Sequence, residues 1–447
     1  MNRVGRVMRG GLLATLLGAA ACAQPGAAAG HAPASAATGP AALSALAPSS
    51  AAPAAKAAAR RPEPLVPSGA AATVYASTEP TDGAKAPADP LRDAIRAAVR
   101  EGARKAGIPT PEVDGRLDLA MNDLARALGP DDLPASEAVD FLLAHYGLPD
   151  PPPEWLIQRA TLGSDGEFAD QIVPQVLETL KAKQAARLGI GVDRSSGELS
   201  VVIGVQAREV DLDAVPRRIR PQKSATIAGR LRASFHDPEL VVTAPDGRVR
   251  EVAVRAAPET RRFEGTIACD AGAGRYQVAV TADGAGGLGV LANFPLYCGV
   301  SPPRHAPVPA GVLPTQTTAK EAEARLLVLV NRDRAAAGLP PLAIDARLAE
   351  TARAHSRDMA DHDFVAHISP TTGSGAERVE RVGLAPDLLL ENVGRAYSAE
   401  AAESGFMASP GHRNNILDRH ARFIGIGVAA GREVAGFVPL FVTQLMM

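Results

Sequence analysis

The stretch that decides the fold of this chain is Ser409-Pro410-Gly411-His412-Arg413-Asn414-Asn415-Ile416-Leu417, close to its C-terminal end. Six further segments accompany this stretch in a fixed order, four before it and two after it. They are residues 327–334, 354–359, 367–370, 391–394, 425–428 and 441–445. Each segment is short and weakly informative by itself, so the specificity lies in the ordered set.

Taken together, these segments resemble the CAP superfamily of cysteine-rich secretory, antigen 5 and pathogenesis-related 1 proteins, and particularly its bacterial secreted branch. The resemblance covers residues from about 320 to 447. It implies an α-β-α sandwich, the CAP domain, at residues 319–447. It implies no particular reaction, because the superfamily has no single activity.

The resemblance also supplies three candidate site residues: His367, Glu391 and His412. In eukaryotic CAP proteins, two histidines and two glutamates line a central cleft and can bind a divalent cation. His367 and His412 match the two histidine positions, and Glu391 matches the first glutamate. Neutral imidazoles are suitable zinc ligands, and a carboxylate can either bind the metal or orient a histidine.

The fourth position of the superfamily pattern differs in this chain. Phe406 stands in the place of a helix tryptophan, and Ser409 stands where the second glutamate is expected. Two histidines and one carboxylate leave zinc with an open, weakly held site. Three interpretations stay open: a buried hydrogen-bonded network, weak binding of a divalent cation such as Zn, and catalysis. No cofactor is otherwise expected.

The remaining histidines and motifs suggest no catalytic residue. His355 falls on the apolar stripe of a predicted helix, so we expect a hydrogen-bonded core histidine. His362 and His420 have charged neighbours, and we expect them at the surface. The sequence contains neither a complete nucleophile elbow nor a His-Glu-x-x-His motif.

The charge balance argues against a nucleic-acid partner. The chain of 447 residues has 47 basic and 49 acidic side chains and a net charge of −2, so no strong field attracts polyanions. Its length allows several domains, each with its own core.

The first residues are typical of an export signal. Arg3, Arg6 and Arg9 precede the apolar run 11–21, so we predict a signal peptide at residues 1–21. Cys22 follows small residues, as in a bacterial lipoprotein, and we predict lipidation there and membrane attachment through that lipid. The alternative is ordinary cleavage that releases a secreted or periplasmic protein.

Two segments have the composition of linkers. Residues 22–89 are dominated by Ala, Pro, Ser and Gly, so we predict a disordered tether. Residues 301–318 are rich in proline and are predicted to be an extended linker.

Residues 90–210 echo the C-terminal domain. Asp114-Gly115-Arg116-Leu117 matches Asp345-Ala346-Arg347-Leu348, and Gly189-Ile190-Gly191-Val192 matches Gly425-Ile426-Gly427-Val428. We therefore predict a divergent CAP-like α+β domain, without counterparts of the two site histidines. The alternative is an unrelated α+β domain with a chance echo.

Residues 215–300 contain short alternating apolar runs separated by turn signals, which predict an immunoglobulin-like β-sandwich. Cys269 and Cys298 are predicted to form a disulfide, as is usual in an exported protein. The glycine-rich residues 284–289 lie between two predicted strands, so we expect a hairpin loop and no phosphate site.

Two functional hypotheses follow. The first is an exported, lipid-anchored CAP-domain protein that binds a ligand at the cell envelope: a cell-wall fragment, a lipid or an envelope protein. The second is a metal-dependent envelope hydrolase that uses His367, Glu391 and His412. We prefer the non-enzymatic hypothesis, because the site is incomplete for catalysis.

Overall fold

The structure is a computed structural model, and it describes residues 64–78, 85–129, 132–161, 165–181, 183, 185–195, 197–306, 311–312, 318–433 and 437–447. The predicted signal peptide, Cys22 and most of the predicted tether lie outside these residues. Within the described part, no helix is both long and apolar enough to cross a bilayer.

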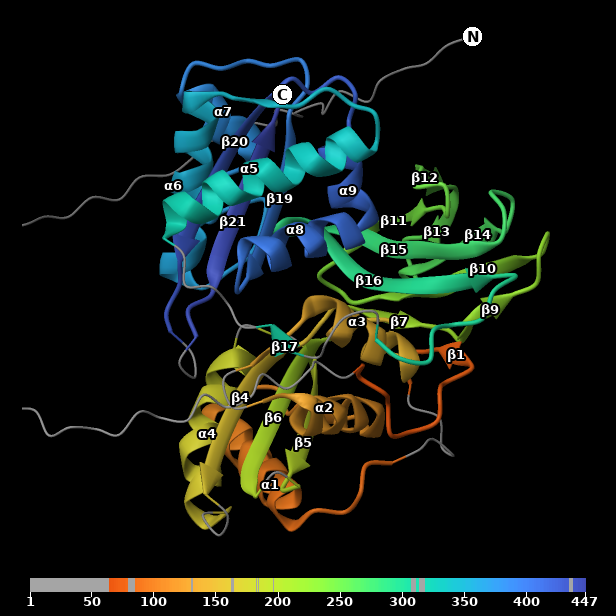
Figure 1. Cartoon of the computed structure of the whole chain (residues 1–447), viewed down its shortest axis with the longest axis vertical. Helices are drawn as coiled ribbons and strands as arrows, with labels where there is room; N and C mark the ends of the chain where they lie inside the picture. Colours follow the sequence, from red (N-terminus) through yellow and green to blue (C-terminus); the bar gives the residue numbers. More distant parts are fainter. Residues whose placement is uncertain are drawn as a thin grey trace, which may run out of the picture. The chain divides into compact units, whose positions relative to one another are not determined.

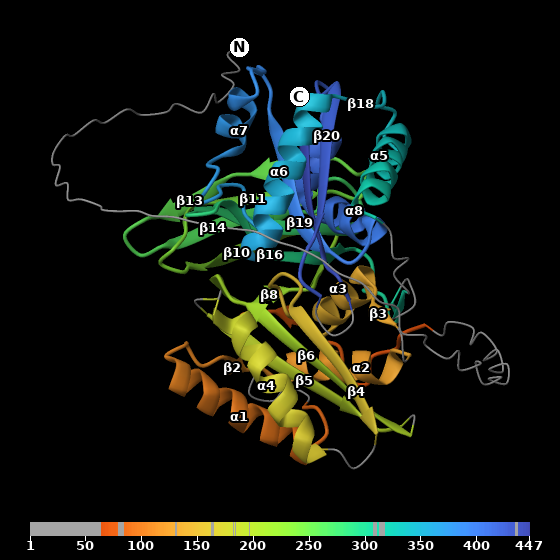
Figure 2. The ribbon, with the colours of Figure 1, turned by 90° about the vertical axis from the view of Figure 1, so that its left-hand side faces the viewer.

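The C-terminal domain is a four-stranded sheet between two layers of helices, as predicted (Figure 1). The strand order is β18-β20-β21-β19. The strands are β18 (Ala343–Ile344), β19 (Leu390–Ala396), β20 (Phe423–Ala430) and β21 (Leu440–Met446). The helices are α5 (Ala319–Ala336), α6 (Ala346–His362), α7 (Gly375–Arg381), α8 (Ala399–Ala408) and α9 (Pro410–Ile416). Figure 2 shows strands β19 and β20 between α6 and α5.

Local sequence signals fix where these helices begin. Thr318 and Glu321 form a capping box at the start of α5. The Asp345 side chain accepts hydrogen bonds from the first turn of α6. Helix α6 then packs closely on β20, since a Cβ added at Gly427 would lie 2.1 Å from the carbonyl carbon of Ala352. Only glycine allows this approach.

The first domain is a second four-stranded sheet with helices on both faces. Its strand order is β2-β5-β6-β4. The strands are β2 (Glu112–Val113), β4 (Glu154–Thr161), β5 (Ala186–Asp193) and β6 (Glu198–Ala207). The helices are α1 (Pro90–Ala106), α2 (Gly115–Ala127), α3 (Ser136–His145) and α4 (Asp165–Lys181). Helices α1 and α4 share one apolar cluster, and α2 and α3 share another on the opposite face (Figure 2).

The two sheets have the same connectivity. Short strand β2 runs parallel to β5, as β18 does to β20, and both sheets continue through two antiparallel pairs. The glycines match too: a Cβ at Gly191 would lie 2.1 Å from the backbone of Met121 on α2. This contact repeats the one between Gly427 and α6.

Between these domains in sequence lies a β domain of two sheets around one apolar core (Figure 1). One sheet has the order β13-β14-β10-β7, and the other β12-β11-β15-β16-β9. The strands are β7 (Val210–Leu212), β9 (Arg218–Ile219), β10 (Ser224–Leu231), β11 (His236–Thr243), β12 (Val249–Val252), β13 (Val254–Ala257), β14 (Arg262–Ala268), β15 (Gly274–Gly284) and β16 (Gly287–Cys298).

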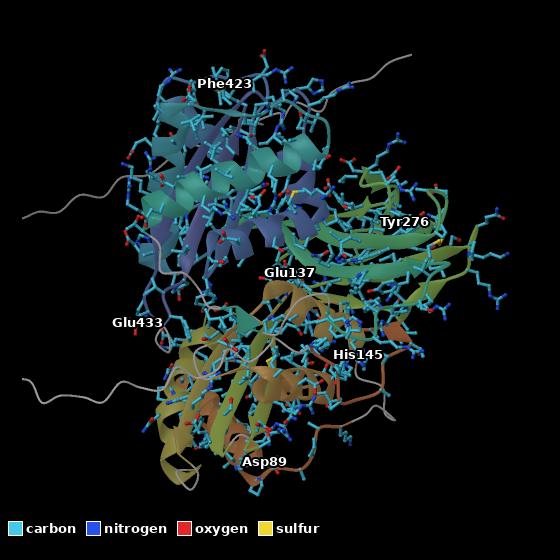
Figure 3. All side chains as sticks on the ribbon, in the orientation of Figure 1. Asp89, Glu137, His145, Tyr276, Phe423 and Glu433 are labelled. Carbon is cyan, nitrogen blue, oxygen red and sulfur yellow. A yellow bond between two sulfur atoms is a disulfide. The ribbon has the colours of Figure 1, made fainter. Side chains whose placement is uncertain are left out.

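Two predictions for this domain are confirmed. Cys269 and Cys298 form a disulfide, which lies on the side of the domain where Figure 3 labels Tyr276. Residues 285 and 286 form the tight turn between β15 and β16, so the glycine-rich stretch is a hairpin loop.

The predicted tether and linker are too long. Residues 64–78 pack against the folded domains: β1 (Val74–Tyr75) pairs with β8 (Val215–Pro216), and the buried Tyr75 hydroxyl donates to the Pro295 carbonyl at 2.7 Å. In the predicted linker, β17 (Gly311–Val312) pairs with β3 (Leu133–Pro134). A few large apolar side chains are enough to anchor such a segment, and averaged composition conceals them.

Candidate functional site

The loop that carries His367 is anchored to α6 through Asp358. The hydroxyls of Ser369, Thr371 and Thr372 all donate to this carboxylate, whose side chain is only 8% exposed. Although burial raises the pKa of Asp358, these hydroxyl hydrogen bonds hold it below its usual value. The ionised carboxylate therefore holds the loop in place.

His355, also on α6, holds the same loop from inside. It is fully buried, and its Nε2 donates to the carbonyl of Ala366 at 2.9 Å. Burial lowers the pKa of His355, so the ring stays neutral. The predicted hydrogen-bonded core histidine is confirmed. His362 and His420 are exposed, as expected.

Glu391, on β19, is in direct contact with His367. Its Oε2 lies 2.9 Å from His367 Nδ1, and its Oε1 lies 2.6 Å from a guanidinium nitrogen of Arg378. Burial raises the pKa of Glu391, but the hydrogen bond from His367 and the charge of Arg378 outweigh it, and the pKa lies below its usual value. Because an ionised carboxylate only accepts, His367 donates through Nδ1, and its Nε2 is left for a ligand.

Arg378 is the residue that sequence reasoning missed. Its side chain is 4% exposed and also donates to the carbonyls of His367 and Gly373. The only local signal is the capping box of Ser374 and Glu377, which starts α7. That pattern predicts the helix, but not that Arg378 turns inward to the carboxylate of a distant strand.

His412, on α9, completes the group. Burial lowers its pKa to about 3, with a smaller electrostatic contribution from the neighbouring His367, so the imidazole is neutral at physiological pH. Its ring packs edge-on against Phe406, with centroids 5.1 Å apart. Phe406 in turn covers Gly394 of β19, where a Cβ would lie 2.9 Å from the phenylalanine ring. The structure thus places Glu391 in contact with His367, and His412 near enough to His367 to be influenced by its charge.

The position of the missing glutamate contributes no acid. Ser409 is buried, and its hydroxyl has no hydrogen-bond partner in the described part of the chain. Glu403, six residues earlier in the sequence, belongs to a different hydrogen-bond network and accepts a hydrogen bond from Gln444 at 3.1 Å. Burial raises the pKa of Glu403 to about 7. Gln444 accepts from Asn392 at 2.9 Å, so buried amides connect this acid to β19.

These donors fit a metal ion only in part. His367 and Arg378 occupy the two oxygens of Glu391, so the carboxylate orients a histidine rather than offering a free ligand atom. Nε2 of His367 and the ring of His412 remain as nitrogen ligands. A zinc ion here would take the rest of its shell from water or a bound molecule.

A different set of side chains meets the distance requirement for a metal. Among the described residues, only His236, Asp237 and Asp283 place three ligand atoms within 4.8 Å of one another. All three lie exposed on the β domain. They are far in sequence from the candidate site, and in the part of the chain that the structure describes no hydrogen bond joins their side chains to those of His367, Glu391 or His412.

A cleft of about 1050 Å³ opens beside His412. Its walls come from β19, α8 and α9, from β4, α3 and α4 of the first domain, and from β16 of the β domain. Trp155 stacks on Tyr397 across this boundary, with ring centroids 4.6 Å apart. His367 and Glu391 do not line the cleft. The β15–β16 turn covers their side of the site, with the Ile368 amide donating to the Gly286 carbonyl at 2.9 Å.

The family follows from a sequence comparison that matches this domain. Residues 327–445 match the model of the cysteine-rich secretory protein family, CAP. The C-terminal part of this chain is a CAP domain. Its β19 strand, with Glu391, and its α9 helix, with His412, both lie inside the matched range.

Two curated proteins of Bacillus subtilis share this likeness. The chain is 35% identical to the uncharacterised protein YkwD over 127 residues, which are 27% of this chain and 49% of that protein. It is 34% identical to the uncharacterised membrane protein YlbC over 114 residues, covering 25% of this chain and 32% of that protein. This chain therefore spans about half the length of the first relative and a third of the second.

Solved structures give a weaker likeness. An extracellular protein containing an SCP domain from Bacillus anthracis is 16% identical and covers 72% of this chain and 94% of its own, with a TM-score of 0.27. A cysteine-rich secretory protein from Staphylococcus aureus is 13% identical and covers 59% and 85%, with a TM-score of 0.22. Scores this low support no argument about the arrangement of the domains.

Proposed function

We propose that this chain is an exported protein that binds a ligand in the cleft of its CAP domain at the cell envelope. The observation that carries the proposal is the state of His412. It is neutral, no hydrogen bond occupies its ring among the described residues, and it lines a cleft large enough for an extended ligand. Its neighbour His367 is oriented by an ionised carboxylate. We infer from this that His412 serves ligand recognition rather than one half of an acid and base pair.

The other domains support this assignment. We interpret the first domain as a divergent CAP-like repeat, because its sheet order and its pair of close-packed glycines match those of the CAP domain. The first domain has no histidine in the places of His367 and His412, so its role is to form one side of the cleft. We interpret the β domain as an immunoglobulin-like sandwich, supported by its two sheets and single core.

Export and anchoring remain part of the proposal. The charged and apolar N-terminal pattern supports a signal peptide, and Cys22 supports a lipid anchor. The Bacillus anthracis structure is of a protein described as extracellular. Mass spectrometry of the membrane fraction should find diacylglyceryl on Cys22 at the mature N-terminus, and a mature start at another residue would exclude the anchor.

A metal-dependent hydrolase is the second candidate, favoured by one observation: the His367–Glu391 hydrogen bond leaves Nε2 of His367 free beside a neutral His412. When bound, zinc would supply a Lewis acid and an activated water. The test is to measure zinc uptake by the dialysed protein and its melting temperature with chelator and with added zinc. No zinc uptake, together with an unchanged melting temperature in both conditions, rules this candidate out.

The binding proposal is tested with His412→Trp, which fills the cleft beside α9, and with His420→Trp as the matched surface control. Cell-wall fragments, lipid extracts and purified envelope proteins are the probes, and the readout is the melting temperature of the full exported chain. We expect at least one probe class to stabilise the wild type and His420→Trp but not His412→Trp. Equal shifts in both variants, or no shift with any probe, would reject the cleft as the ligand site.

A further inference from the structure

The cleft beside His412 is bordered by two strand edges. Within the described residues, β19 pairs with β21 alone and β4 with β6 alone, so each ends its sheet. Residues 154–156 of β4 and residues 393–396 of β19 line the cleft. Such edges carry backbone N–H and C=O groups that an added extended chain can pair with.

The charge at the cleft is acidic. Six carboxylates and two arginines line the cleft, and Lys181 and Lys183 pair with two of these carboxylates, which leaves a net formal charge of about −2 with neutral histidines. The carboxylates are Asp140, Glu154, Glu178, Asp361, Asp363 and Glu433, and the arginines are Arg395 and Arg432. Figure 3 shows Glu433 on the loop that follows β20.

Half of these carboxylates are already neutralised by ion pairs. Arg395 pairs with Glu154 and Asp363, Lys183 also pairs with Glu154, and Lys181 pairs with Glu178. Among the described residues, the other three form no ion pair. These three are Asp140, Asp361 and Glu433. The surplus of negative charge is therefore available to a ligand.

Two further features of the lining point to an amine-bearing ligand. Trp155, the single tryptophan of the sequence, stacks on Tyr397 at 30° in the cleft wall, and aromatic faces attract ammonium and guanidinium groups. Ser409 also lines the cleft, is 5% exposed, and has an Oγ without a hydrogen-bond partner among the described residues. A buried hydroxyl of this kind costs free energy unless a ligand group bonds to it.

We propose that the ligand of this cleft is an extended peptide with basic side chains. Its backbone pairs with a strand edge, its lysine or arginine side chains lie at the free carboxylates, and their aliphatic stems contact the Trp155–Tyr397 pair. Nucleic acids and anionic lipid headgroups are repelled by the same lining. The inference rests on the proposed function, in which the cleft is the ligand site, and it adds the class of ligand.

The test uses the full exported chain and a fluorescein-labelled octapeptide of alternating Lys and Val, with alternating Glu and Val as the opposite-charge probe. Fluorescence anisotropy should show binding of the Lys-Val peptide that weakens as salt rises from 50 to 300 mM. Asp361→Asn combined with Glu433→Gln should weaken binding about fivefold, because each partly exposed ion pair contributes modestly.

The matched control removes two exposed carboxylates of the β domain that do not line the cleft, through Glu251→Gln with Glu259→Gln. We expect no change in affinity for this variant. Equal weakening in both double variants, or equal binding of the Glu-Val peptide, overturns the charge argument. Spermine that binds as tightly as the Lys-Val peptide overturns the strand-edge part, because spermine has no peptide backbone.

The outcome separates this inference from the proposed function. If a cell-wall or lipid probe loses binding in His412→Trp while the Lys-Val peptide binds nowhere, the cleft is the ligand site and the basic-peptide class is wrong. If the peptide binds and His412→Trp leaves its affinity unchanged, the peptide uses another surface and the basic-peptide inference fails, while the cleft proposal is still decided by the melting-temperature shifts of His412→Trp with the other probes.

Discussion

Replacing Arg378 by methionine should destabilise the CAP domain more than any exposed ion-pair substitution. Arg378 is 4% exposed and lies 2.6 Å from Glu391, which is itself only 9% exposed. Methionine keeps much of the side-chain volume but leaves the Glu391 carboxylate buried without its cation. Removing one partner of a buried pair in this way costs about 3 kcal/mol or more.

The chain offers a matched control in Arg325, which pairs with Glu400 at 2.7 Å. The geometry is nearly the same, but these side chains are 50% and 58% exposed. Water screens such a pair, so Arg325→Met should cost less than about 1 kcal/mol. The residue types and ion-pair distances agree, so the difference between the two variants measures burial together with the two backbone carbonyl bonds that Arg378 also makes.

The readout must report on the CAP domain rather than on the whole chain. Trp155 lies in the first domain and stacks on Tyr397 of the CAP domain, so its fluorescence would mix the unfolding of both domains. Hydrogen exchange of peptides from β19 and α7, read by mass spectrometry, measures the local opening free energy. Urea unfolding followed by circular dichroism then gives the global value.

A second substitution tests the cause. In Arg378→Met the unpaired Glu391 carboxylate carries the penalty, so adding Glu391→Gln should recover part of the lost stability. Two results would contradict this reasoning. In the first, Arg378→Met destabilises the domain no more than Arg325→Met does. In the second, the double variant loses the sum of the two single-variant losses, and either result would mean that the buried pair does not hold the His367 loop.

Three further predictions concern packing, the disulfide and pH. Gly427→Ala should lower the free energy of unfolding in urea by about 3 kcal/mol, because the new Cβ would lie 2.1 Å from the backbone of α6. Gly405→Ala in α8 is the control: its Cβ meets no atom within 4 Å, so this variant should be more stable by up to about 1 kcal/mol. Reducing the Cys269–Cys298 disulfide should remove about 3 kcal/mol, seen as a lower melting temperature with dithiothreitol; an unchanged melting temperature would contradict this. The pKa of His412 is about 3 in the folded state and near 6.5 in the unfolded state, so between these pH values the folded state binds fewer protons. The free energy of unfolding should therefore fall as the pH drops from 6.5 towards 3, by up to about 1.4 kcal/mol per pH unit. His412→Phe should flatten that slope, as measured by urea unfolding at each pH.

The sequence alone determined the elements that depend on local pattern. The ordered motifs between residues 327 and 445 predicted the CAP domain. Apolar alternation and turn residues predicted the β15–β16 hairpin, and the two distant cysteines predicted the disulfide. These features follow from residues that are neighbours in the chain or, as with the three cysteines, few in number, so their pairing has few alternatives.

Tertiary structure alone decided which side chains of the site contact one another. Arg378 belongs to a short helix and Glu391 to a strand, and nothing along the chain connects them until the domain folds. The same holds for the neutral state of His412, which comes from burial and from a histidine 45 residues away in sequence. Electrostatic environment depends on distance in space and on exclusion of water, and the linear sequence specifies neither directly.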